Sequence, residues 1–173
     1  RMGTKVTFLP DAEIFETTIF VYDTLKGRLR ELAYLNKGLR ISLEDKRAGQ
    51  EQKDSFCYEG GICSFVEELN KSREELLFPT PVYFEEQEGD TVCEVAIQYN
   101  ESYNEVIYSY ANNVNTRDGG THVEGLKMAL TKVINDAGHK LNVLKESEKL
   151  SGEDVREGIT AVVSVKLTNA QFE

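Results

Sequence analysis

The stretch VYFEEQEGDTVCEVAIQYNESYNEVIYSYA, residues 82–111, carries the clearest secondary-structure pattern in the chain. Apolar and polar residues alternate along three runs, which polar turns at 88–90 and 100–104 separate. A period of two residues is typical of strands with one buried face, and short turns join antiparallel neighbours. The stretch therefore predicts a meander of three antiparallel strands.

The residues that follow predict the longest helix of the chain. A glycine-rich turn at 118–120 leads to Thr121 and Glu124, whose spacing fits a capping box. Apolar residues then recur at helical spacing through position 137. The opposite, polar face of this helix carries Lys127, Thr131 and Asn135.

The same reasoning predicts further elements on both sides. Before the meander they are a strand at 5–9, a helix with Asp23 as its N-cap that ends near Gly38, and a hairpin with the exposed connection 44–53. A helix at 62–69 and an extra helical turn opened by Ser72 and Glu75 follow the hairpin. After the long helix come a polar link at 138–150, a turn at 151–154 and a strand at 161–167. Helices that occur between the strands of an antiparallel or mixed sheet indicate an α+β fold. We expect a two-layer mixed sheet with helices on one face and a single core.

Composition limits the class of protein. The 173 residues suffice for one domain with a short appendage. They include 30 Asp and Glu against 20 Lys and Arg, a net charge of −10. Because affinity for DNA depends mainly on cations that displace counterions from phosphates, this balance excludes a free-standing nucleic-acid binder and leaves only local basic clusters open. No apolar run approaches the ~20 residues that span a bilayer, so we expect a cytoplasmic protein with no membrane partner.

Few residues suggest chemistry. The cysteines, Cys57, Cys63 and Cys93, are odd in number and match no zinc motif, which predicts free structural thiols. The histidines, His122 and His139, have no further ligands at fixed spacing, so we expect no metal site. Acidic pairs and serines lack the neighbours that acid–base or acyl-transfer chemistry needs, so we expect no catalytic residue.

Two sequence patterns are compatible either with ligand binding or with a purely structural role. A phosphate favours a glycine-preceded helix N-terminus such as 118–121, but the lysine of a P-loop is missing there, and a tight turn is the favoured interpretation. Four tyrosines are potential stacking platforms for single-stranded nucleic acid, although ordinary packing is favoured for residues at strand spacing in an acidic domain. They are Tyr99, Tyr103, Tyr108 and Tyr110.

Five segments together resemble the B subunits of bacterial DNA gyrase and topoisomerase IV. They are GTKVTFLPD at 3–11, RLRELAYLNKGL at 28–39, YEGGI at 58–62 with SFVEELN at 64–70, YANNVNTRDGGTHVEGLKMALT at 110–131 and LSGEDVREGITAVVSVK at 150–166. The resemblance implies that residues 1–16 are the last strand of a GHKL-type ATPase domain with its connector, and that 17–173 are most of a transducer domain. It also implies a left-handed β-α-β crossover, against the usual right-handed preference.

The same resemblance implies where ligands would bind. Thr4 matches a position that lines the adenine pocket, and a Gln-Thr-Lys loop expected after Glu173 would reach the ATP γ-phosphate. The other groups that hold ATP and Mg²⁺ belong to the ATPase domain, so we expect no cofactor and no ATP turnover in this chain by itself. Lys127 matches a basic position on the wall of a cavity through which DNA passes; a merely solvated lysine is the alternative.

The implied function is to relay ATP binding and hydrolysis to gate closure and duplex passage in an ATP-dependent type II topoisomerase. The implied partners are a gyrase A subunit, a second B subunit in an A2B2 assembly, and duplex DNA. Two alternatives stay open. One is the corresponding part of a topoisomerase IV B subunit, and the other is a non-enzymatic α+β interaction module with no link to an ATPase.

Overall fold

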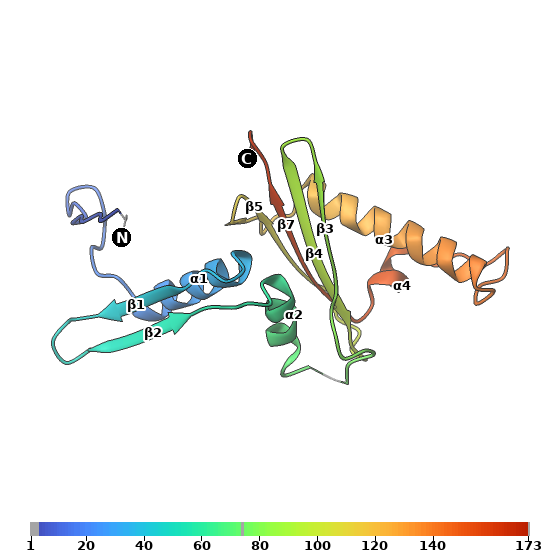
Figure 1. The fold of residues 1–173 in the computed structure, drawn as a ribbon, viewed down its shortest axis with the longest axis horizontal. Helices are drawn as coiled ribbons and strands as arrows, with labels where there is room; N and C mark the ends of the chain where they lie inside the picture. Colours follow the sequence, from blue (N-terminus) through green and yellow to red (C-terminus); the bar gives the residue numbers. More distant parts are fainter. Residues whose placement is uncertain (1–3, 74, 173) are drawn as a thin grey trace.

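The computed structural model describes residues 4–73 and 75–172. The helices are α1 Tyr22–Leu35, α2 Ile62–Asn70, α3 Thr121–Lys140 and α4 Gly152–Arg156. The strands are β1 Ile41–Asp45, β2 Gln52–Phe56, β3 Val82–Glu88, β4 Thr91–Tyr99, β5 Val106–Ala111, β6 Val114–Asn115 and β7 Ile159–Lys166. Figure 1 shows an elongated molecule, with α1 and the β1–β2 hairpin on one side of a central sheet and α3 on the other.

The central sheet is mixed and has the strand order β3-β4-β7-β5-β6. β4 pairs antiparallel with both β3 and β7, whereas β5 pairs parallel with β7. A parallel pair needs a long crossover, and here the crossover runs from β5 through β6, α3 and α4 to β7. Every residue of β7 from Ile159 to Val165 is buried, which requires a central position with both faces covered.

The predicted meander is wrong in one respect. β3 and β4 form the expected hairpin, but β7 separates β4 from β5. Alternation within 82–111 predicts which residues form strands, and it carries no information about a strand that joins from much later in the chain.

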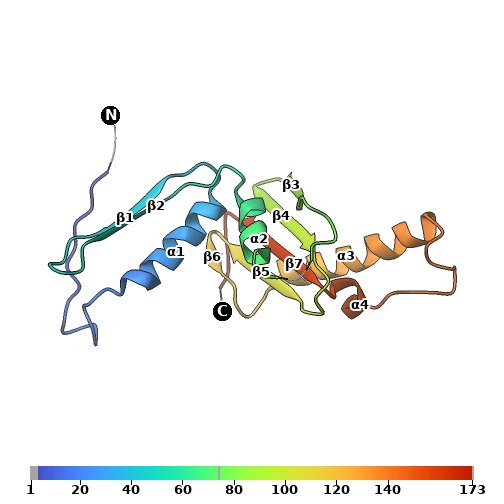
Figure 2. The same cartoon turned by 90° about the horizontal axis from the view of Figure 1, so that it is seen from below.

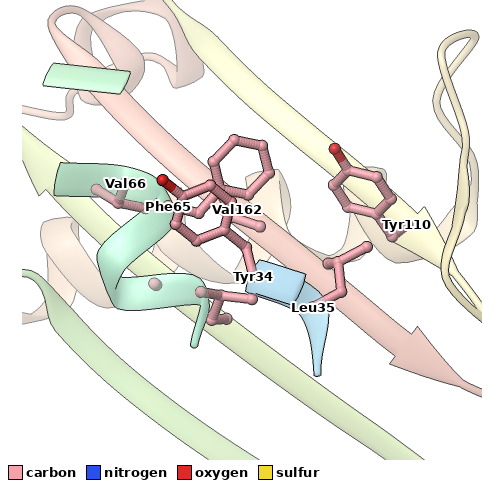
Figure 3. Close-up of a cluster of buried hydrophobic side chains, with 8 residues drawn as sticks. Tyr34, Leu35, Phe65, Val66, Tyr110 and Val162 are labelled. Carbon is pink, nitrogen blue, oxygen red and sulfur yellow. The ribbon is translucent and has the colours of Figure 1, made fainter. Parts of the chain in front are cut away.

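Helices cover both faces of the sheet. The mixed α+β class is confirmed, while the expected two layers with one core are corrected to a sheet with a core on each side. On one face α1 and α2 enclose a core in which Tyr34 stacks on Phe65, with ring centroids 4.8 Å apart (Figure 3). On the other face Val123 of α3 belongs to a core with Val95 and Val163.

A buried polar network fixes α2 on its face of the sheet. Asn70, the last residue of α2, donates to Gln98 Oε1 and accepts from Thr160 Oγ1, each at 2.7 Å. Asn100 Nδ2 donates to the same Asn70 oxygen at 3.2 Å. All four side chains are buried. A buried network whose members are paired favours a single arrangement of the core.

Residues 5–9 do not form the expected strand. A strand needs partners for its backbone groups, and no described strand pairs with this segment. Its apolar side chains are largely exposed, with Phe8 at 73% and Leu9 at 91%. Residues 4–21 instead form an arm that lies apart from the central sheet and leads into α1 (Figure 2). The arm turns back on itself after Asp11, so that the rings of Phe8 and Phe20 lie 6.2 Å apart.

The helix starts also differ from the expectation. The N-cap of α1 is Val21 rather than Asp23, which lies in the first turn. The N-cap of α3 is Gly120, so Thr121 makes no capping box. Ser151 and Asp154 form a capping box at the start of α4 instead. The extra helical turn expected from Ser72 and Glu75 includes residue 74, which lies outside the described residues; Ser72, Arg73 and Glu75 are not helical, and Leu76 forms an isolated bridge with Asn100.

Asn70→Ala should lower the free energy of unfolding by about 3 kcal/mol. It leaves Gln98 Oε1 without a partner and leaves Asn100 Nδ2 and Thr160 Oγ1 only their mutual 3.4 Å contact, and buried groups that lose a partner cost about 1–3 kcal/mol each. Urea titration followed by circular dichroism measures the change. Asn104→Ala, at an exposed turn position, is the matched control and should cost less than about 0.5 kcal/mol. Equal losses in the two variants would show that the network does not hold α2 on the sheet.

Candidate functional site

Lys127 on α3 belongs to a cluster of three charged side chains. Its Nζ lies 3.0 Å from Glu105 Oε1, and Arg156 Nε donates to the other carboxylate oxygen at 2.9 Å. The side chain of Lys127 is 27% exposed and that of Arg156 is 16% exposed. Two cations therefore share one carboxylate, and the cluster retains a net positive charge.

Three separate elements bring these side chains together. Lys127 lies in the second turn of α3, and Glu105 ends the turn between β4 and β5. Arg156 is the last residue of α4, whose start is fixed by the capping box at Ser151. A Cβ on Gly152 would lie only 2.6 Å from the Arg156 guanidinium, so the glycine leaves room for that side chain.

The cluster borders a groove of about 560 Å³ that α3 forms with residues 149–156. Four cations line the groove, and only two carboxylates do. The cations are Lys127, Lys132, Lys149 and Arg156, and the carboxylates are Glu124 and Asp136. In a chain with a net charge of −10, this local excess of cations creates a surface that can accept a phosphate or another anion.

The electrostatics of Glu105 favour the ionised cluster. Partial burial raises the pKa of the Glu105 carboxyl, but hydrogen bonds from Arg156 and Lys127 outweigh this effect and lower the pKa below its ordinary value. The carboxylate therefore remains charged and acts as the resident counter-ion of both cations.

The face of α3 that holds Lys127 is more covered than helical spacing predicts. Asn135, expected on the solvated face with Lys127, is buried. Its side chain donates to the Leu150 carbonyl at 3.1 Å and accepts from the Leu150 N–H at 2.8 Å. The end of the polar link therefore lies against α3, and its Lys149 lines the groove.

Thr4, the candidate adenine-pocket residue, lies in the exposed arm. The arm, drawn in blue, and α3 occupy opposite sides of the molecule (Figure 1). The structure does not bring Thr4 and Lys127 into one site, so any roles they have are separate.

The glycine-rich turn before α3 is a tight turn held by side chains. Gly119 and Gly120 have φ values of +88° and +148°, which side-chain-bearing residues rarely adopt. The hydroxyls of Ser109 and Thr116 lie 2.6 Å apart, and Thr116 Oγ1 lies 3.1 Å from His122 Nε2. Burial lowers the pKa of His122, which favours the neutral ring. The favoured structural interpretation of 118–121 is confirmed.

Packing accounts for three of the four candidate tyrosines. Tyr110 is fully buried, the Tyr108 ring lies 5.5 Å from that of Phe65, and the Tyr99 hydroxyl donates to the Val155 carbonyl at 2.6 Å. Tyr103 is 85% exposed. The surface that three of them would need for stacking on bases is therefore occupied by the protein itself.

The remaining candidate side chains have ordinary surroundings. His139 Nε2 lies 2.8 Å from the Glu148 carbonyl oxygen. The thiols of Cys57, Cys63 and Cys93 are free. Within residues 4–73 and 75–172, no group of three or more His, Cys, Asp or Glu side chains is placed to hold a metal ion. None of the helices in that part of the chain has the length and apolar character needed to cross a bilayer.

Sequence reasoning missed two members of the charged cluster. Arg156 had a usable signal, because the spacing of Ser151 and Asp154 fits a capping box and predicts a helix that carries Arg156 one turn later. Glu105 had none, since it is a turn residue whose partners come from distant segments.

Comparisons with known proteins converge on one family. The DNA gyrase B family matches residues 61–173. The DNA gyrase B subunits of Halalkalibacterium halodurans and Clostridium acetobutylicum are each 56% identical to the chain, over 100% and 99% of its length. The chain spans only 27% of either relative.

Solved structures give the same result. The 43K ATPase domain of Thermus thermophilus gyrase B, in complex with an aminocoumarin, matches with a TM-score of 0.83 and 38% identity, over 95% of this chain and 44% of that one. The topoisomerase IV ATP-binding domain of Francisella tularensis matches with a TM-score of 0.76 and 25% identity, over 94% of this chain and 43% of that one.

Glu105→Gln should lower the free energy of unfolding at pH 7, because it removes the charge that holds Lys127 and Arg156. The pKa of Glu105 in the folded state is below its ordinary value of 4.5, so its stabilising contribution is present above that value and is lost as the pH falls through the folded-state pKa. Urea titrations at several pH values should show wild type and variant converging in acid. Glu148→Gln, in an exposed pair with Lys145, is the control and should have little effect at pH 7. A gap that persists in acid would contradict this account.

Proposed function

Since the chain belongs to the DNA gyrase B family, we propose that it forms the transducer part of a type II DNA topoisomerase subunit. In this proposal residues 1–16 connect it to an ATPase domain. Residues 17–173 relay ATP binding and hydrolysis to gate closure and to the passage of a DNA duplex during supercoiling. The chain corresponds to 44% of the matched gyrase B ATPase-domain structure, which is compatible with a further domain attached to it.

A packed connection from α1 to the central strand carries the proposal. The arm 4–21 leads directly into α1, and the C-terminal end of α1 is buried. Tyr34 and Leu35 share a core with Val162 of β7. Because close-packed cores do not deform continuously, a displacement of α1 would move the sheet with it as a rigid body. The apolar side chains exposed along the arm provide a surface on which a neighbouring domain can act.

Nucleotide and Mg²⁺ would be held by the neighbouring ATPase domain. This chain would contribute Thr4 to the adenine pocket and, through residues expected after Glu173, a lysine to the γ-phosphate. The exposed position of Thr4 supports this arrangement, since a residue at the edge of a shared pocket needs the rest of the pocket to bind a ligand.

The 173-residue chain by itself should hydrolyse ATP at no more than the background rate. A single threonine in an exposed arm cannot supply the positioning and charge stabilisation that phosphoryl transfer requires. A phosphate-release assay measures this, with the full-length subunit as the positive control. Turnover by the isolated chain clearly above background would contradict the proposal, whereas turnover confined to the full-length subunit agrees with it.

We further propose that Lys127 makes a transient phosphate contact with the passing duplex. The groove beside it supports this role, because Lys132, Lys149 and Arg156 line the same surface. Such a contact would carry no sequence information, which suits a cavity that must accept any DNA. Glu105 would return as the counter-ion of Lys127 once the duplex has left.

Lys127→Gln in the full-length subunit should weaken DNA-stimulated ATP hydrolysis and leave DNA-independent hydrolysis unchanged. Loss of one phosphate contact should also reduce the slope of log DNA affinity against log salt concentration by about one unit. Lys145→Gln is the matched control, because it likewise removes one lysine from an ion pair, with Glu148, but lies outside the groove. Identical salt dependence in wild type and Lys127→Gln would show that Lys127 is merely solvated.

A gyrase role is favoured over a topoisomerase IV role by the identities. Among the solved structures, the gyrase B chains of Thermus thermophilus and Myxococcus xanthus are 38% and 32% identical to the chain, against 25% for the topoisomerase IV chain. The family match likewise disfavours an interaction module unrelated to an ATPase. The proposed partners are a gyrase A subunit and a second B subunit, as A2B2, and the proposed location is the cytoplasm.

A further inference from the structure

Two consecutive asparagines form the turn between β5 and β6. Asn112 and Asn113 have φ values of 48° and 64°, both left-handed, and the flanking Ala111 and Val114 pair with each other. This geometry is typical of a two-residue type I′ hairpin turn. Asparagine tolerates left-handed backbone better than most residues, and unlike glycine it has a side chain free to make a contact.

The Asn112 side chain pairs with the backbone of Leu167 in the way that a strand residue would. Asn112 Oδ1 accepts from the Leu167 N–H at 2.8 Å, and Asn112 Nδ2 donates to the Leu167 carbonyl at 2.9 Å. The Asn112 N–H also donates to the Val165 carbonyl at 2.8 Å. Because the backbone of β5 turns away at this point, the side chain extends the ladder between β5 and β7 by one residue. It holds the chain where the chain leaves the sheet.

Asn113 connects the same turn to α1. Its carbonyl oxygen accepts from the Arg28 guanidinium. Its side-chain amide lies 3.5 Å from Asn36 Oδ1, just after the last residue of α1. The two asparagines therefore lie between the helix that follows the arm and the strand end that leads into residues 168–172.

We propose that Asn112 is a positioning residue that sets the path of the chain beyond β7. The inference rests on the proposed function, in which the segment after Leu167 leads to the contact with the γ-phosphate. Asn112 does not touch the nucleotide in this scheme. It acts through the backbone of Leu167, so its loss should change how the subunit distinguishes ATP from ADP and leave the fold intact.

Asn112→Gly and Asn113→Gly form a matched pair for the test in the full-length subunit. Both keep the left-handed turn, but only Asn112→Gly removes the two hydrogen bonds to Leu167. Amide hydrogen exchange at Leu167 should become about tenfold faster in Asn112→Gly and stay within about twofold of wild type in Asn113→Gly. Affinity for a non-hydrolysable ATP analogue should fall about tenfold in Asn112→Gly, while affinity for ADP, which lacks the γ-phosphate, stays unchanged.

Asn112→Asp separates shape from hydrogen bonding. It keeps the size, the left-handed tolerance and the acceptor, but it sets a carboxylate oxygen against the Leu167 carbonyl, so it should resemble Asn112→Gly in both measurements. Unchanged exchange at Leu167 in both variants would overturn the proposal. Faster exchange with unaltered preference for the ATP analogue over ADP would overturn the positioning role and leave the proposed function standing. A wild-type subunit without that preference would overturn the proposed function and, with it, the role of Asn112.

Discussion

Strand β7 is buried on both faces from Ile159 to Val165, and this burial determines how the other elements can be arranged. A strand with two covered faces needs a neighbour on each side and a layer above and below, because an edge position would leave apolar side chains and backbone groups in water. β4 and β5 supply the neighbours, and the cores around Phe65 and Val123 supply the layers. Because β5 runs parallel to β7, the chain must cross the sheet between them, and α3 lies in that crossover.

Local patterns predicted most elements, because alternation and helical spacing depend only on nearby residues. The β3–β4 hairpin and α2 follow from such patterns, and α2 runs from Ile62 to Asn70, one residue longer than expected. Strand order could not be predicted in this way, since the pairing of β7 is decided by burial across the whole sheet. The two capping motifs show a similar limit. Thr121 and Ser151 both fit the motif, but only Ser151 stands at the N-cap, because the chain before α3 turns through Gly120 instead.

The candidate site was predictable only in part, for a related reason. The position of Lys127 on a polar helix face followed from spacing, but its environment depends on Glu105 and Arg156, which only the folded chain brings to it. The groove could not be predicted from the acidic net charge either, because the net charge of the whole chain says nothing about where its cations lie. In the proposed role, a protein that contacts DNA only transiently has reason to combine an acidic average with a small basic surface. The average field limits residence, and the local cations still permit brief contact.

The distribution of burial suits a part that transmits motion between neighbours. Its centre is stiff, since Val162 touches no solvent and the Asn70 network is paired. Its ends are not self-sufficient, because the arm exposes Phe8 and Leu9, which gain little free energy until another surface covers them. Segments with few buried contacts open most easily, whereas a packed core moves as one body. A lever needs both properties. In the proposed role, a neighbour that binds the arm would displace α1, and the sheet would move with α1 because the two share one core.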